Sequence, residues 1–263
     1  MKSLSVILLL IISVVSCSHK NKKQPKNDYS PVVSFEEAGS EFKSQVQLPK
    51  EFKDRLPLVI VVHEWWGRNA YVEKRAQMLT AEGFAALPVD IFGDAKTVST
   101  PKEAQDLATP FYQNPQMGID RLNKYIELAK KDPHVNPERI YVIGYCFGGS
   151  QALNLARSGA EVKGVVSFHG GLASSYKAKN IKADILVLNG AADPMVPPKD
   201  VKAFDKEMKV SGAKHQLINY QGATHAFTNP QATAIGQKYN IPIAYDQAAD
   251  EDSWKELMKF LRK

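Results

Sequence analysis

The amino-acid sequence predicts an α/β protein with a mostly parallel sheet and helices on both faces. Short apolar runs, of the kind that parallel sheets bury, alternate with amphipathic helical patterns along most of the chain. The chain has 263 residues, of which 44% are hydrophobic, so it can bury one large core. The sequence contains no internal repeat and no sign of a second domain.

Six short apolar runs are expected to form the main sheet. They cover residues 58–62, 84–87, 140–143, 165–168, 185–188 and, as the weakest of the six, 216–220. Before them, apolar and small side chains occupy every second position from residue 42 to residue 48. This alternation predicts an early strand at a sheet edge.

Helical patterns fall between these runs. Asn69 is placed to cap a helix that ends at Gly83. Side chains expected on buried helical faces are Val72, Ala76 and Leu79; Leu122, Ile126 and Ala129; Val201, Phe204 and Met208; and Trp254, Leu257, Met258 and Leu261. Residues 97–117 are expected to be partly helical and to lie over the end of the sheet. Residues 229–245 contain Pro and Gly and are expected to form a long ordered loop.

The N-terminus resembles a lipoprotein signal peptide. Lys2 supplies a positive charge, and residues 4–15 form an apolar run that is too short to span a bilayer. The run leads to Val14-Val15-Ser16-Cys17, which is similar to the lipidation site of bacterial lipoproteins. We therefore expect a signal peptide over residues 1–16, a lipidated Cys17 and a flexible basic tether over residues 17–30. The alternative is an ordinary leader with an incidental cysteine.

This N-terminus predicts an exported, membrane-anchored protein whose α/β domain covers residues 31–263. The expected location is periplasmic or the cell surface, and the outer membrane if the cell has two. The residue after Cys17 is Ser18, whereas an aspartate at that position is associated with retention in the inner membrane.

The charge of the chain lies mostly in this N-terminal region. Residues 1–30 hold five lysines and one aspartate, so the formal net charge of +6 falls to +2 for residues 31–263. A domain so close to neutral is a poor nucleic-acid binder. We expect no nucleic-acid partner, no cofactor and, because no paired His or Cys spacing occurs, no metal. The oligomeric state stays open.

The run Gly144-Tyr145-Cys146-Phe147-Gly148-Gly149 joins the 140–143 strand to a helical segment. Gly-x-nucleophile-x-Gly between a strand and a helix is the nucleophile elbow of α/β-hydrolases, here with Cys in place of Ser. The glycines allow close backbone approach around a strained turn, and the helix N-terminus favours a thiolate. Cys17 is the other cysteine, so lipidation would leave Cys146 without a disulfide partner. The alternative for Cys146 is a buried, small apolar residue.

A thiol nucleophile needs a base, and the base needs an acid that orients it. In α/β-hydrolases these groups follow strands in the order nucleophile, acid, histidine. His225 follows the 216–220 strand, and Asp193 follows the 185–188 strand, so the predicted triad is Cys146, Asp193 and His225. The alternative for Asp193 is a turn or a helix cap.

The first main strand ends in His63-Glu64-Trp65-Trp66-Gly67. The loop at this point commonly supplies one oxyanion-hole amide, so we expect the backbone N–H groups of Trp65 and Phe147 to form the hole. Glu64 is either an acid in an apolar site or a salt-bridge partner. Candidate pocket residues are Trp66, His169 and Phe227, although His169 could instead be a hydrogen-bonded structural residue.

Together these motifs resemble the dienelactone hydrolase family of α/β-hydrolases. The matching runs are 63–67, 144–149, Asp193-Pro194 with Val196-Pro197, and Thr224-His225-Ala226-Phe227, and the similarity covers about residues 45–263. The resemblance implies an α/β-hydrolase fold and a Cys146, Asp193, His225 triad. It also implies that Glu64 contacts the resting thiol and helps to activate it when substrate arrives.

Two positions depart from the family pattern. Family members that open dienelactone carry two arginines that grip the substrate carboxylate, and this chain has Asp94 and Asn229 at those positions. A carboxylate would lose two bidentate partners. We therefore expect a hydrolase of small esters or lactones, with thioesters as a close variant, for which dienelactone is not the natural substrate. Arg68 is either a substitute for the arginines or a solvated surface charge.

Two other functions are compatible with the same scaffold. One is a non-catalytic, ligand-binding lipoprotein, because a fold does not determine a function. The other is a redox role for Cys146, which the absence of a resolving cysteine disfavours.

Overall fold

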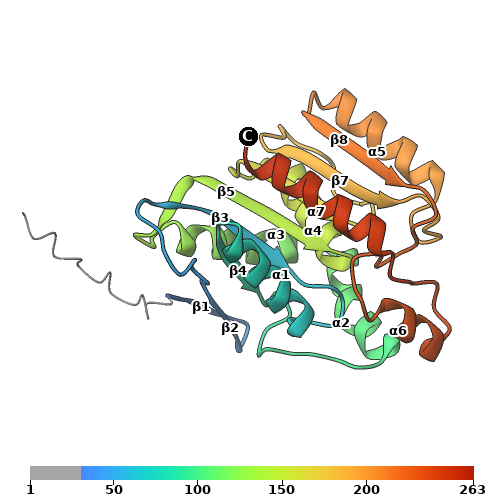
Figure 1. The fold of residues 1–263 in the computed structure, drawn as a ribbon, viewed down its shortest axis with the longest axis horizontal. Helices are drawn as coiled ribbons and strands as arrows, with labels where there is room; N and C mark the ends of the chain where they lie inside the picture. The colour runs from blue at the N-terminus through green and yellow to red at the C-terminus, as the bar shows by residue number, and fades with distance from the viewer. Residues whose placement is uncertain (1–30) are drawn as a thin grey trace, which may run out of the picture.

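A six-stranded parallel sheet forms the centre of the computed structural model, which describes residues 31–263 (Figure 1). The strand order is β4-β3-β5-β6-β7-β8, and every neighbouring pair is parallel. The strands are β3 (Leu56–Val62), β4 (Ala85–Val89), β5 (Val135–Tyr145), β6 (Gly164–Phe168), β7 (Asp184–Gly190) and β8 (His215–Tyr220). All six predicted runs are confirmed as strands. The chain adds β4 on one side of β3 and β5 on the other side. This reversal of strand order between β3 and β5 opens a crevice at their carboxyl ends.

Helices cover both faces of this sheet, as the sequence predicts. One face packs against α1 (Ala70–Ala81) and α7 (Gln247–Leu261), which lie in front of the sheet in Figure 1. The other face packs against α2 (Pro101–Gln113), α3 (Gln116–Ala129), α4 (Phe147–Arg157) and α5 (Pro198–Val210). Strand β3 shows the reason: Val59 and Val61 join the first layer, whereas Ile60 and Val62 join the second.

The predicted helix signals are also present. The Asn69 side chain accepts a hydrogen bond from the Tyr71 N–H group at 3.1 Å and so caps α1. Leu79, Leu122, Phe204 and Leu257 are each among the buried side chains of their helices. Residues 97–117 contain α2 and the start of α3, in agreement with the expected partly helical segment.

The expected early strand at a sheet edge is confirmed over residues 42–45, and it ends before residues 46–48. Residues up to Gln45 belong to a separate antiparallel hairpin of β1 (Val32–Glu37) and β2 (Ser40–Gln45). In this hairpin Phe42 stacks on Phe35 with 4.9 Å between ring centroids, and Phe35 in turn contacts Tyr125 of α3. Only an isolated bridge between Gln47 and Ala86 joins this segment to β4, the edge of the main sheet.

The prediction of a long ordered loop over residues 229–245 is wrong for its central part, which forms α6 (Ala232–Tyr239). Gly236 favours a break in the sequence pattern, yet it lies inside the helix. A Cβ atom at this position would overlap the Ile243 carbonyl oxygen, so the returning chain packs directly against the helix backbone.

The signal peptide, Cys17 and the tether lie outside the described residues, so those predictions stay predictions. Within residues 31–263, none of the helices has the length and apolar character needed to cross a bilayer.

Candidate active site

Cys146 lies between the last residue of β5 and the first residue of α4. Its φ of 53° and ψ of −117° put a non-glycine residue in a strained region of backbone space. Its N–H group donates to the Phe168 carbonyl oxygen at 3.0 Å and to Nδ1 of His169 at 3.2 Å. The end of β6 therefore holds the strained turn in place.

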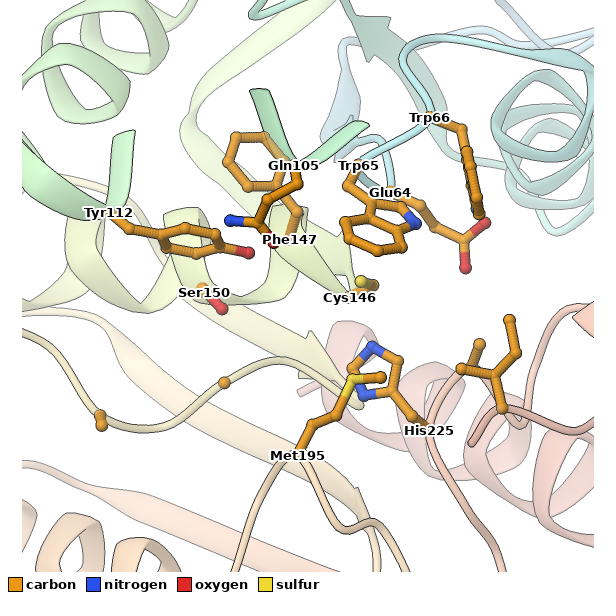
Figure 2. Close-up of a pocket in the computed structure, with 14 residues that line it drawn as sticks. Glu64, Trp65, Trp66, Gln105, Tyr112, Cys146, Phe147, Ser150, Met195 and His225 are labelled. Carbon is orange, nitrogen blue, oxygen red and sulfur yellow. The ribbon is translucent and has the colours of Figure 1, made fainter. Parts of the chain in front are cut away.

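The first turn of α4 packs against the carboxyl end of β3. A Cβ atom on Gly148 would overlap the carbonyl oxygens of Val62 and His63, and a Cβ atom on Gly144 would overlap the Gly148 carbonyl group. Glycine at these positions therefore permits the close approach. The result places Cys146 beside Glu64, the second residue after β3 (Figure 2).

His225 and Asp193 meet as the sequence predicts from their order. Nδ1 of His225 lies 2.7 Å from Oδ2 of Asp193, and Oδ1 of Asp193 accepts a hydrogen bond from the Met195 N–H group. Nε2 of His225 is buried and has no hydrogen-bond partner among residues 31–263. Figure 2 shows the imidazole ring of His225 facing Cys146.

The charges around His225 favour its protonated form. Burial lowers the pKa of the imidazole, but the negative charge of a Cys146 thiolate and the hydrogen bond to Asp193 outweigh burial and hold the pKa well above its usual value. The arrangement can therefore store a proton on His225 next to a nucleophilic sulfur.

Glu64 is buried in the same cavity wall, with 2% of its surface exposed. Burial raises the pKa of its carboxyl group to about 7, although the Asn229 hydrogen bond and His225 act in the opposite direction. Nδ2 of Asn229 donates this bond to Oε2 of Glu64 at 2.8 Å. Across the described part of the chain, Glu64 makes no hydrogen bond to Cys146, so Asn229 is its partner in this structure.

A cavity of about 360 Å³ opens above these residues. Cys146, His225 and Glu64 line it, and Asp193 lies behind His225. The aromatic rings of Trp65, Trp66, Tyr112 and Phe147 form much of its wall, and the polar side chains of Gln105 and Ser150 also line it. The backbone N–H group of Phe147 belongs to the first turn of α4 and has no partner within the helix, so it is free to act as an oxyanion donor beside Trp65.

The structure separates the candidate pocket residues. Trp66 lines the cavity, whereas His169 and Phe227 do not; both are fully buried below it. Burial lowers the pKa of His169 well below its usual value, so the ring is neutral. Its Nδ1 accepts from Cys146, and its Nε2 therefore donates to Oγ1 of Thr228 at 2.7 Å. His169 thus has the structural role that the sequence left as its alternative.

Arg68 and Asp94 lie away from the cavity. Nη1 of Arg68 donates to the Lys43 carbonyl oxygen at 3.0 Å, and Asp94 accepts from the Glu41 N–H group at 2.9 Å. Both side chains therefore contact the β1–β2 hairpin. The residues that line the cavity include no lysine or arginine. Within residues 31–263, no group of three or more His, Cys, Asp or Glu side chains is placed to hold a metal ion.

Sequence reasoning did not identify Gln105, Tyr112, Ser150 or Met195 as cavity residues. Ser150 alone had a usable signal, because it lies four residues after Cys146 on a predicted helix and so shares its face. The others reach the cavity from segments whose docking depends on tertiary packing.

Comparisons with known proteins identify the family of this chain. Residues 42–263 match the sequence model of the dienelactone hydrolase family. A putative carboxymethylenebutenolidase of Aquifex aeolicus is 25% identical over 237 residues, which cover 88% of this chain and 97% of that protein. A probable 2-oxo-3-(5-oxofuran-2-ylidene)propanoate lactonase of Bradyrhizobium sp. is 28% identical over 228 residues, or 79% of this chain and 84% of that protein.

A solved structure, described as a dienelactone hydrolase-like promiscuous phosphotriesterase from metagenomic libraries, superposes with a TM-score of 0.82. It is 28% identical, and the match covers 89% of this chain and 97% of that chain. The six-stranded parallel sheet with helices on both faces is thus an α/β-hydrolase fold, and the chain belongs to the dienelactone hydrolase family.

Proposed function

We propose that this ester and lactone hydrolase cleaves small, uncharged substrates with Cys146 as nucleophile, His225 as acid and base, and Asp193 as the group that orients His225. The observation that carries the proposal is the position of the His225 ring. Nδ1 binds Asp193 at 2.7 Å, while Nε2 faces the thiol at the cavity wall.

The proposed reaction has two halves. The Cys146 thiolate attacks the substrate carbonyl, and the backbone N–H groups of Phe147 and Trp65 stabilise the oxyanion. His225 then gives its Nε2 proton to the departing alcohol oxygen, which leaves a thioester between Cys146 and the acyl group. In the second half His225 takes a proton from water, the resulting hydroxide attacks the thioester, and the carboxylic acid departs from a restored thiolate.

Glu64 is proposed to assist ionisation of the thiol. Its carboxyl group titrates near neutral pH and lies in the same cavity as Cys146, so its ionised form can take up a proton. The hydrogen bond to Asn229 holds the Glu64 carboxylate in its present orientation, and the carboxylate must rotate to reach the Cys146 sulfur.

The proposed substrates carry no carboxylate because no lysine or arginine lines the cavity to bind one, and the charge of protonated His225 already faces Cys146 and Asp193. An anionic substrate would also meet the Glu64 carboxylate as pH rises above about 7. Dienelactone, which carries a carboxylate, is therefore expected to be a poor substrate.

Hydrolysis of p-nitrophenyl butyrate tests the proposal. We expect Cys146→Ala and His225→Ala to lower kcat by about 10⁴-fold or more. His215→Ala is the matched control because His215 pairs with Asp205 at the opposite end of the sheet, and it should retain activity. Equal rates for wild type and Cys146→Ala would instead favour the non-catalytic binding protein.

We also propose that Cys17 carries lipid and tethers the enzyme to a membrane outside the cytoplasm. The apolar run before Cys17 supports this location. The Cys17→Ser variant should move from the membrane fraction to the soluble fraction with its esterase activity intact. An unchanged membrane fraction would contradict the tether.

A further inference from the structure

Two hydroxyl groups in the active-site cavity make no hydrogen bond to another side chain or to the backbone of residues 31–263. Tyr112 on α2 and Ser150 on α4 both line the cavity with Cys146. Neither hydroxyl makes a hydrogen bond within residues 31–263, although most polar side chains near the site do. A polar group that faces a substrate cavity without a partner is available to a ligand.

Both residues contact the nucleophile segment, Tyr112 through its ring and Ser150 through its backbone. The Tyr112 ring packs edge-on against Phe147, with 5.8 Å between centroids and an interplanar angle of 83°. Ser150 lies one turn after Cys146 in α4, and its N–H group donates to the Cys146 carbonyl oxygen at 3.2 Å. Their positions relative to the thiol are therefore set by the elbow itself.

The chemistry indicates which half of the substrate reaches them. The departing alcohol oxygen must face Nε2 of His225 to receive its proton. Figure 2 shows His225 and Met195 on one side of Cys146 and the Tyr112 and Ser150 side chains on another. With the alcohol directed toward His225, the acyl chain extends along the cavity toward the two hydroxyls.

The charge of this region favours an uncharged partner. Hydroxyl groups donate and accept without a formal charge, and no lysine or arginine lines the cavity to bind an anion. A plain alkyl chain would displace water from both hydroxyls without replacing its hydrogen bonds. A carbonyl or hydroxyl group on the acyl chain would replace them.

We infer that Tyr112 and Ser150 form an acyl-recognition subsite, which selects esters and lactones whose acyl part carries an uncharged hydrogen-bonding group. This inference rests on the proposed function, because Cys146 and His225 set the direction of the acyl chain.

Acyl selectivity with a constant leaving group tests the inference. The substrates are the p-nitrophenyl esters of pentanoate and hexanoate, of 4-oxopentanoate and 5-oxohexanoate, and the hydrogen succinate and hydrogen glutarate esters. Rates are corrected for hydrolysis without enzyme. At one or both chain lengths, kcat/KM should be about 3- to 10-fold higher for the oxo ester than for the alkyl ester, as expected for one added hydrogen bond. The anionic esters should be the slowest.

The variants assign this preference to the two hydroxyls. Tyr112→Phe and Ser150→Ala should each lower the ratio of oxo to alkyl kcat/KM by about threefold or more. Tyr176→Phe removes a hydroxyl outside the cavity and should keep the wild-type ratio. Two separate variants protect the test against the misfolding of one.

Two outcomes would overturn the inference. They are an oxo preference that survives both variants and no oxo preference in the wild type at either chain length. Each of these presupposes turnover that depends on Cys146. Loss of that dependence would instead refute the proposed triad, so the two failures are distinct.

Discussion

Replacing Glu64 by glutamine should stabilise the folded protein at alkaline pH. Burial raises the pKa of Glu64 to about 7, against 4.5 for the exposed group, so the folded state binds its proton more tightly than the unfolded state. Between pH 4.5 and about pH 7 the unfolded chain releases the Glu64 proton, whereas the folded protein still holds it. The wild type therefore loses unfolding free energy over this range, and the loss levels off above about pH 7.

The size of the effect follows from the two pKa values. Their separation of about 2.5 pH units corresponds to about 3 kcal/mol, at about 1.4 kcal/mol for each pH unit. Glutamine cannot ionise, yet its carbonyl oxygen can still accept the Asn229 hydrogen bond. The Glu64→Gln variant should thus exceed the wild type by about 3 kcal/mol at pH 8 but by less than about 1 kcal/mol at pH 5.

Urea unfolding followed by far-UV circular dichroism at the two pH values measures this difference. Glu138→Gln provides the control, since Glu138 is exposed and its replacement should not alter the pH dependence. A Glu64→Gln stability gain that is equal at pH 5 and pH 8 would show that Glu64 is already ionised in the folded protein at pH 5. Glu64→Gln should also lower the esterase rate, because the variant gains stability by giving up a carboxyl group that the reaction uses.

Three further perturbations address the support of the site. Asn229→Asp removes the donor to Glu64, so the acidic limb of kcat/KM should move to higher pH by about one to two units. His169→Leu removes one acceptor of the Cys146 backbone N–H group. Steady-state kinetics should show kcat about 5- to 10-fold lower with KM little changed. Gly148→Ala forces a Cβ atom against Val62, and thermal unfolding should report a destabilisation of about 1–3 kcal/mol.

The contradicting results are equally specific. Asn136 accepts a hydrogen bond from the N–H group two residues later, as Asn229 does, but it lies near the start of β5 and outside the cavity lining. Asn136→Asp should therefore leave the pH profile unchanged, and a shift equal to that of Asn229→Asp would remove the local explanation. Equal changes in kcat and KM for His169→Leu, or a wild-type melting temperature for Gly148→Ala, would contradict the corresponding contacts.

The sequence was sufficient to predict the sheet and which residues lie close together at its edge. Buried parallel strands appear as apolar runs, and the carboxyl ends of such strands converge at one edge. Residues that follow β5, β7 and β8 must then be neighbours, which is why chain order predicts that Cys146, Asp193 and His225 meet. Their roles in the reaction remain part of the proposal.

The residues of the cavity wall were harder to predict from the sequence. Tyr112 reaches Phe147 only because α2 docks over the end of the sheet, and no periodicity in α2 specifies that docking. Asn229 and Glu64 are 165 residues apart in the chain, and Asn229 is an amide where the family pattern has an arginine. Neither residue therefore indicates in the sequence that it pairs with the other. Gly236 misled the helix prediction because its packing against Ile243 cannot be read from local sequence.

The segment after His225 links these supports into one unit. Thr228 receives the Nε2–H of His169, whose other nitrogen binds the nucleophile's backbone, and the next residue, Asn229, binds Glu64. In family members that open dienelactone, the position of Asn229 supplies an arginine to the substrate carboxylate. Here the same position contacts an internal acid, so a substrate carboxylate has no direct means of displacing Glu64 from its partner. Under the proposed function, activation by an uncharged substrate therefore acts through the thiol and His225.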